Sequence, residues 1–217
     1  MKAKNSGTLK KPKKYPHFDF PMKSIAEIQK LEGEFLSKES VKSYSFYPFL
    51  AFLKKEVRFK RQKDTVTKKI TLKFDKRKVR PLLYASHKDS LLYSWYAFVL
   101  ASLYEKVLAD SGLGDIVAAY RKDRTSKRSN ITTAYDFFSE IKKREEDGCS
   151  VLLFDVEKFY DTLDPDILKE CWLNTLNANT EEKLAELPLD HYNVYKSIVK
   201  YGVVNKALLN EFLHKKY

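Results

Sequence analysis

An alternation of apolar and basic residues between Glu56 and Phe74 limits the structures open to this chain more than any other feature. Two stretches repeat with a period of two, the first being Val57, Arg58, Phe59 and Lys60 and the second Lys69, Ile70, Thr71, Leu72, Lys73 and Phe74. This period is typical of a β-strand, because successive side chains point to opposite faces. The polar segment 62–65 predicts a turn, and therefore a β-hairpin with one apolar and one basic face.

The same region holds much of the positive charge. Residues 54–80 contain 13 Lys or Arg residues against three acids, in a chain of 217 residues with a formal net charge of +12. Residues 1–14 add six lysines without an acid. Like charges this close repel unless a polyanion lies against them, so the hairpin predicts contact with nucleic acid. A solvated lysine-rich surface and an anionic membrane surface are the alternatives that charge alone leaves open.

The cations expected to bind nucleic acid lie on the two predicted strands and beside their turn. They are Arg58, Lys60, Arg61, Lys69 and Lys73.

Several segments have a helical pattern. Ser24–Leu36 has apolar residues at helical spacing, and Ser86 followed by Asp89 predicts a capping box that starts a helix reaching about Asp110. Asp164–Pro165 predicts another helix start. We expect residues 190–217 to be helical throughout, and residues 130–147 to form a helix with Ile131, Ala134, Phe138 and Ile141 directed inward.

An aromatic run precedes the hairpin. Its members are Tyr44, Phe46, Tyr47, Phe49 and Phe52. Such a run can pack in a core or stack on bases, and we expect packing.

Asp155 directly follows an apolar run, Cys149 to Phe154, of strand length. A continuous apolar run predicts a central strand buried on both faces. Its end would hold the carboxylate at a rigid, exposed position suited to Mg²⁺, which prefers oxygen ligands. The alternative is an aspartate that only caps the following turn.

Three motifs in order resemble the reverse transcriptases, most closely the bacterial defence-associated (abortive-infection-type) branch. The stretch from Phe74 through Arg80 to Leu82 is similar to the fingers motif of that family, and the stretch from Ala118 to Ile131 is similar to the next one. The stretch from Phe154 to Asp161 resembles the palm motif that carries the first metal-binding aspartate.

The resemblance implies a role for each matching residue. Asp155 would be the catalytic ligand of two Mg²⁺ ions, with help from the carbonyl of Val156. Tyr160 would be the steric gate under the incoming sugar, beside Phe159. Arg80 would hold the triphosphate with Lys78 nearby, and Arg121 would shape that pocket or contact template. The implied partners are an RNA or DNA template-primer and a deoxynucleoside triphosphate.

The sequence departs from the family after Asp161. The family has two adjacent aspartates on a later hairpin, and no later acids in this chain match that box. One carboxylate cannot assemble a two-metal site. We therefore expect the N-terminal part of an RNA-directed DNA polymerase of antiphage defence that is inactive alone and completed by a C-terminal half or by self-association.

The fold expected is α+β, with a basic arm (1–21), a fingers-like region (22–148) and a partial palm (149–217). The N-terminus shows no secretory signal pattern, and a cytoplasmic protein is predicted. Two other functions remain open at this stage. The chain could be a non-catalytic nucleic-acid-binding or oligomerising remnant, or an unrelated basic adaptor in which Asp155 is a turn residue.

Overall fold

The computed structural model describes residues 15–35, 37–63, 65, 68–114, 116–117, 121, 130–146, 148–157 and 159–216. The chain is mixed α and β, which agrees with the predicted α+β class at that level. It divides into two compact units, Met1–Trp95 with Leu189–Tyr217, and Tyr96–Pro188. Every helix in the described part is too short or too polar to span a bilayer. Residues 189–217 belong to the same unit as the N-terminal part of the chain.

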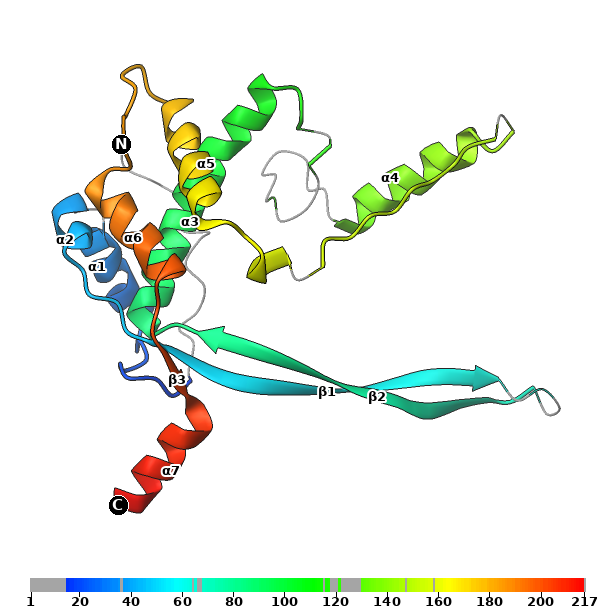
Figure 1. The fold of residues 1–217 in the computed structure, drawn as a ribbon, viewed down its shortest axis with the longest axis horizontal. Helices are drawn as coiled ribbons and strands as arrows, with labels where there is room; N and C mark the ends of the chain where they lie inside the picture. Colours follow the sequence, from blue (N-terminus) through cyan, green and yellow to red (C-terminus); the bar gives the residue numbers. More distant parts are fainter. Residues whose placement is uncertain are drawn as a thin grey trace. The chain divides into compact units, whose positions relative to one another are not determined.

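A small sheet organises the first unit. β1 (Phe49–Lys63) pairs antiparallel with β2 (Ile70–Tyr84) and parallel with β3 (Val203–Asn205), in the order β2-β1-β3. The predicted hairpin is confirmed and is longer than its alternating pattern. In Figure 1 its outer part extends as a two-stranded ribbon away from the helices of its own unit.

β3 overturns the expectation that residues 190–217 are all helical. The segment forms α6 (Leu189–Val199), then β3, then α7 (Lys206–Lys216). The β-branched pair Val203 and Val204 favours an extended backbone, and the Gly202 carbonyl accepts a hydrogen bond of 2.9 Å from the Phe49 amide. The edge of β1 therefore converts the middle of this segment to a strand.

Three short helices pack against one another in the first unit. α1 (Ile25–Phe35) confirms the helix predicted at Ser24–Leu36, and the short α2 (Lys38–Lys42) packs against α6. The Asn193 side chain on α6 donates 2.8 Å hydrogen bonds to the carbonyls of Val41 and Tyr44. The most deeply buried apolar side chains of this unit are Ile28, Val41, Leu50, Leu92 and Val194.

α3 (His87–Asp110) begins in the first unit and ends in the second. The predicted cap is confirmed, since the Asp89 amide donates to Ser86 Oγ at 3.1 Å. In a complete capping box the Asp89 carboxylate would accept a hydrogen bond from the Ser86 amide. Here that carboxylate binds another segment of the chain. Asp89 instead accepts hydrogen bonds from the Tyr44 hydroxyl (2.8 Å) and the Tyr47 amide (3.0 Å).

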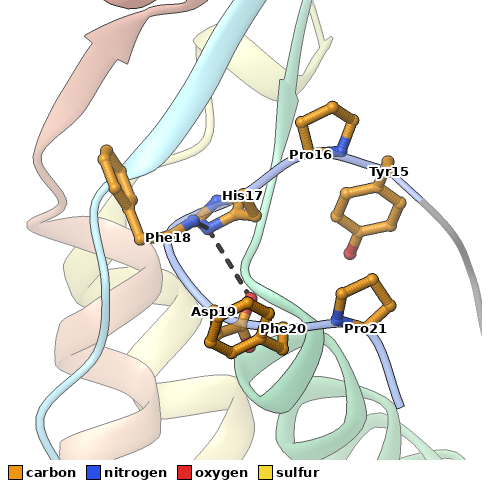
Figure 2. A pocket seen from close by; sticks show the side chains of 7 residues that line it. All are labelled: Tyr15, Pro16, His17, Phe18, Asp19, Phe20 and Pro21. Carbon is orange, nitrogen blue, oxygen red and sulfur yellow. Dashed lines mark hydrogen bonds and ion pairs between the residues drawn. The ribbon is translucent and has the colours of Figure 1, made fainter. Parts of the chain in front are cut away.

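Asp19 supplies the remaining cap of α3 from a distant part of the sequence. It accepts hydrogen bonds from the amides of His87 (3.0 Å) and Lys88 (2.9 Å), and its Oδ1 lies 2.7 Å from His87 Nδ1. Asp19 belongs to residues 15–21, here called the strap, which line a hollow of about 450 Å³ (Figure 2). These residues of the predicted basic arm are thus fixed against α3.

The second unit contains the rest of α3, then α4 (Asn130–Lys143), a 3-10 turn (Phe159–Asp161) and α5 (Pro165–Asn177). The predicted start of α5 is confirmed, since Asp164 accepts from the Asp166 and Ile167 amides. The inward face expected on α4 is wrong. Ile131 is 82% exposed and Phe138 is also exposed, because no described element covers that side. Buried apolar side chains of this unit are Tyr96, Leu108, Trp172, Leu176 and Leu187.

We predict that Asp19→Ala lowers the free energy of unfolding by about 1–3 kcal/mol, because two helix amides lose their acceptor. Burial acts to raise the pKa of Asp19, but hydrogen bonds from His87 and Lys88 hold it below its ordinary value. The contribution is therefore present above the unfolded-state pKa of about 3.9 and is lost as the pH falls through the folded-state pKa. Urea melts at neutral and acidic pH measure both effects.

Asp110→Ala, at the exposed opposite end of the same helix, is the control, and we expect it to be neutral or slightly stabilising. Equal stability of Asp19→Ala and the native chain at neutral pH would contradict the cap.

Candidate nucleic-acid interface and the Asp155 segment

The register between β1 and β2 collects cations on one face of the hairpin. Residues directly opposite in an antiparallel pair share a face. The pairs on this face are Lys54 with Arg80, Glu56 with Lys78, Arg58 with Lys76, Lys60 with Lys73 and Gln62 with Thr71. We call this surface the basic face; it has seven cations and one acid, and three of its five pairs are cation against cation.

A β-bulge makes this face continuous. The register shifts between Arg58 and Phe59, so that Asp75 has no direct partner in the ladder. If the ladder continued without this shift in register, every side chain of β2 before Lys76 would lie on the other side. With it, Lys73 lies on the same face as Lys76, and Lys60 Nζ lies 3.0 Å from Asp75 Oδ1.

The opposite surface, here called the apolar face, is exposed as well. Its large apolar side chains are Leu53, Val57, Phe59, Ile70, Leu72, Phe74 and Val79, and each is about half exposed or more. Lys55, Arg61, Lys63 and Arg77 lie on the same side by register. The predicted two-faced hairpin is therefore confirmed for the basic face, while the apolar face is apolar only in part.

Glu56 is the acid within the basic face. It lies 2.9 Å from Lys54 Nζ and 3.8 Å from an Arg80 guanidinium nitrogen. The hydrogen bond from Lys54, followed by the charge of Arg80, lowers its pKa, so Glu56 stays ionised and offsets part of the repulsion. Arg80, expected to hold a triphosphate, is thus a member of this face together with Lys78, and its role toward a triphosphate stays a prediction.

Of the five cations predicted to bind nucleic acid, the structure brings three together. Arg58, Lys60 and Lys73 are on the basic face, whereas Arg61 lies on the opposite side, across from Leu72. Lys69 precedes β2 and takes no part in the ladder. Sequence reasoning missed Lys54 and Lys76. The alternation could have identified Lys54, but Lys76 joins the face only through the bulge.

Arg121 lies in the second unit and is held by its own surroundings. Its Nε and a terminal nitrogen donate to the two Glu105 carboxylate oxygens at 2.9 and 2.6 Å, and it also donates to the carbonyls of Gly114 and Val117. This bidentate pair fastens the segment after α3 to that helix. A nucleotide-binding role for Arg121 stays a prediction.

The buried strand predicted at residues 149–154 is wrong. Val151–Val156 has no strand partner among the described residues, and its apolar side chains are exposed, with Leu153 at 95% and Phe154 at 86%. A strand buried on both faces needs neighbours on each side. The described sheet, β2-β1-β3, does not include this segment, so the segment lies extended in solvent with Asp155 also exposed.

The residues that follow form a short aromatic turn. Phe159 and Tyr160 are exposed and meet edge to face, with ring centroids 5.3 Å apart. The metal site expected at Asp155 stays a prediction. Within the described residues there is no group of three or more His, Cys, Asp or Glu side chains placed to hold a metal ion. Asp155 and the Val156 carbonyl could supply two oxygen ligands, and Mg²⁺ needs six in near-octahedral geometry.

Comparison with known proteins assigns this chain to no family. No protein-family model matches this chain, and no curated protein matches it. The site must be interpreted from its own geometry.

We predict that Leu153→Lys lowers binding of a hydrophobic dye and lowers concentration-dependent light scattering without lowering the melting temperature. The side chain is almost fully exposed, so a lysine removes apolar surface and breaks an aggregation-prone extended run. Ile167→Lys, an exposed position on α5, is the control and should change scattering little. A melting temperature several degrees lower for Leu153→Lys would show that this segment is buried in the folded chain.

Proposed function

We propose that the chain binds nucleic acid along the basic face of the β1–β2 hairpin, as the fingers-like and partial palm portion of a reverse-transcriptase-type polymerase. One observation carries the binding proposal. Seven cations share one face of an exposed two-stranded ribbon, three pairs of them directly opposite one another. Such pairs destabilise a hairpin unless an anion lies between them. A polyanion with regularly spaced charges turns this repulsion into attraction.

The dimensions of the face suit a nucleic-acid backbone. From Lys54 to Lys60 the strand rises about 20 Å at roughly 3.3 Å per residue. Phosphates along one strand of a duplex are about 3.4 Å apart along its axis, so the face spans several of them. If all seven cations made contacts with a single strand, log affinity would fall with log salt with a slope of about −5.

The polymerase part of the proposal rests on the motifs and on the exposure of Asp155. A carboxylate at the end of an extended apolar segment is open to a metal ion and to further ligands. Bound Mg²⁺ would activate the attacking hydroxyl and stabilise the leaving pyrophosphate. In this chain Asp155 and the Val156 carbonyl would hold it, Tyr160 would lie beside the sugar, and carboxylates other than those described would complete the site.

A second function is a nucleic-acid-binding remnant without catalysis. The solvent-exposed Asp155 segment favours it, since a segment outside any described sheet holds its carboxylate loosely. Both functions share the basic face and differ only in the role of Asp155.

We predict that Arg58→Gln with Lys76→Gln weakens binding of a labelled oligonucleotide and makes the salt slope shallower by about 1.4–1.8. These side chains face each other on the basic face. The matched control is Lys55→Gln with Lys63→Gln, which removes the same charge from the opposite side of the same hairpin. Fluorescence anisotropy over a salt series measures the affinity and the slope.

The two double variants distinguish binding by the basic face from attraction through the net charge of the chain. If the strand binds on the basic face, the first variant has a lower affinity for the oligonucleotide, and the control keeps the salt slope of the unaltered chain. Equal losses in both would mean that the chain attracts polyanions only through its net charge.

We predict that Asp155→Asn abolishes Mg²⁺-dependent nucleotide incorporation by a polymerase that contains this chain, by several orders of magnitude. The amide keeps the size of the carboxylate and loses the anion that holds the metal. Oligonucleotide affinity and melting temperature should stay unchanged, because Asp155 is exposed and lies outside the basic face. Normal incorporation by the variant would leave the non-catalytic function.

A further inference from the structure

The row of cations on the basic face ends at two aromatic rings. Phe52 and Tyr84 lie two and four residues beyond Lys54 and Arg80 toward the base of the hairpin, on the same face by register. Their ring centroids are 5.5 Å apart at an interplanar angle of 73°. Phe52 belongs to an aromatic run whose sequence predicts packing, yet 37% of it is exposed. The face thus changes from charged to aromatic without leaving the strand pair.

A further cation lies over both rings. Lys206, the first residue of α7, places its Nζ 5.8 Å from the centroid of Phe52 and 5.7 Å from that of Tyr84. Cations within about 6 Å of a ring face are attracted by its negative face. The same ammonium group therefore lies over this aromatic pair at the end of the cation row.

The rings are held from two directions. The Tyr84 hydroxyl donates to the Pro16 carbonyl at 3.3 Å, and its ring meets Tyr15 of the strap edge to face at 5.1 Å. On the other side β3 pairs with Phe49–Ala51, immediately before Phe52, and leads directly into Lys206. Three separate segments meet at this point of the hairpin, and their contacts hold the Tyr84 ring and the backbone next to Phe52.

Of three polyanions, a single nucleic-acid strand, a blunt duplex and an anionic lipid surface, one matches both the cation row and the aromatic pair. A single nucleic-acid strand carries phosphates on its backbone and bases with unpaired π-faces, whereas a blunt duplex keeps its base faces stacked on one another. An anionic lipid surface offers phosphates without rings to stack.

We propose that Phe52 and Tyr84 form a stacking platform for an unpaired base of a single strand whose phosphates follow the basic face, with Lys206 contacting the phosphate of the stacked nucleotide. The platform rests on the proposed nucleic-acid binding and adds to it the ligand class, single-stranded rather than fully paired. It also fixes the position of the bound strand, with the stacked base at the root of the hairpin and the phosphate contacts running toward its tip.

The test compares Phe52→Leu with the unaltered chain in fluorescence anisotropy, using a labelled oligothymidylate and a blunt duplex as probes. Leucine keeps the apolar contact and removes the ring. Base–aromatic stacking is sequence-tolerant and its loss weakens binding by about 5- to 150-fold per base. We expect a loss in that range for the single strand, none for the duplex, and an unchanged salt slope because every cation remains.

Two further variants control for side effects. Phe52→Tyr keeps a ring and should bind as the unaltered chain does. Phe74→Leu removes a ring of the same size from the apolar face, where Phe74 lies opposite Phe59, and should bind normally. If Phe52→Leu melts early, quenching of a 2-aminopurine base placed in the single strand and bound to the unaltered chain decides the matter, since stacking on a ring quenches it.

The possible results separate the platform from the binding proposal. Failure of the unaltered chain to bind either probe overturns both. Binding of the single strand that Phe52→Leu does not weaken, an equal loss for Phe74→Leu, an equal loss for the duplex, or unquenched 2-aminopurine overturns the platform alone and leaves the basic face standing.

Discussion

Electrostatic repulsion across the β1–β2 pair is the constraint on which the rest of the first unit depends. An isolated two-stranded ribbon is at best marginally stable in water, and this one places cations opposite cations. Three local devices offset the repulsion. Glu56 lies between Lys54 and Arg80, Asp75 lies beside Lys60, and β3 adds a third strand at the base. β3 pairs with β1 at Phe49–Ala51, so the outer part of the hairpin that the structure describes is two-stranded, and a bound polyanion is its natural counterpart.

The base of the hairpin is built from the two ends of the described chain. The strap caps α3 through Asp19 and meets Tyr84 through Tyr15, while β3 brings Lys206 to the same ring. These contacts are long-range, and each joins segments that have weak structural preferences of their own. Fixing them together orders the root of the hairpin, where Tyr84 and Lys206 also belong to the proposed platform, and involves none of the cations of the basic face.

Local patterns in the sequence predicted the elements that depend on local physics. The hairpin, the Ser86 cap, the start of α5 at Asp164 and the α1 helix follow from periodicity and capping, which act over a few residues. β3 could not be found in this way, because its helical-looking surroundings are overridden by pairing with β1. The bulge at Asp75 was equally hidden, since an extra residue is defined only against its partner strand. For the site, alternation identified Arg58, Lys60 and Lys73, and misplaced Arg61.

The error at residues 149–154 has a different origin, and it bears on how an Asp155 site could form. The run has the composition of a central strand, and the hydrophobic term that would bury its four apolar side chains from Val151 to Phe154 is roughly 6–12 kcal/mol. In the described chain that term is not realised, because no strand lies beside the run. Any element that pairs with it would gain this burial, satisfy its backbone groups and fix the Asp155 carboxylate in one step. If the proposed metal site forms at Asp155, formation of a sheet around the segment and formation of that site would therefore be one coupled event. A carboxylate that is loosely held while the segment is solvated becomes a preorganised ligand when the segment is paired.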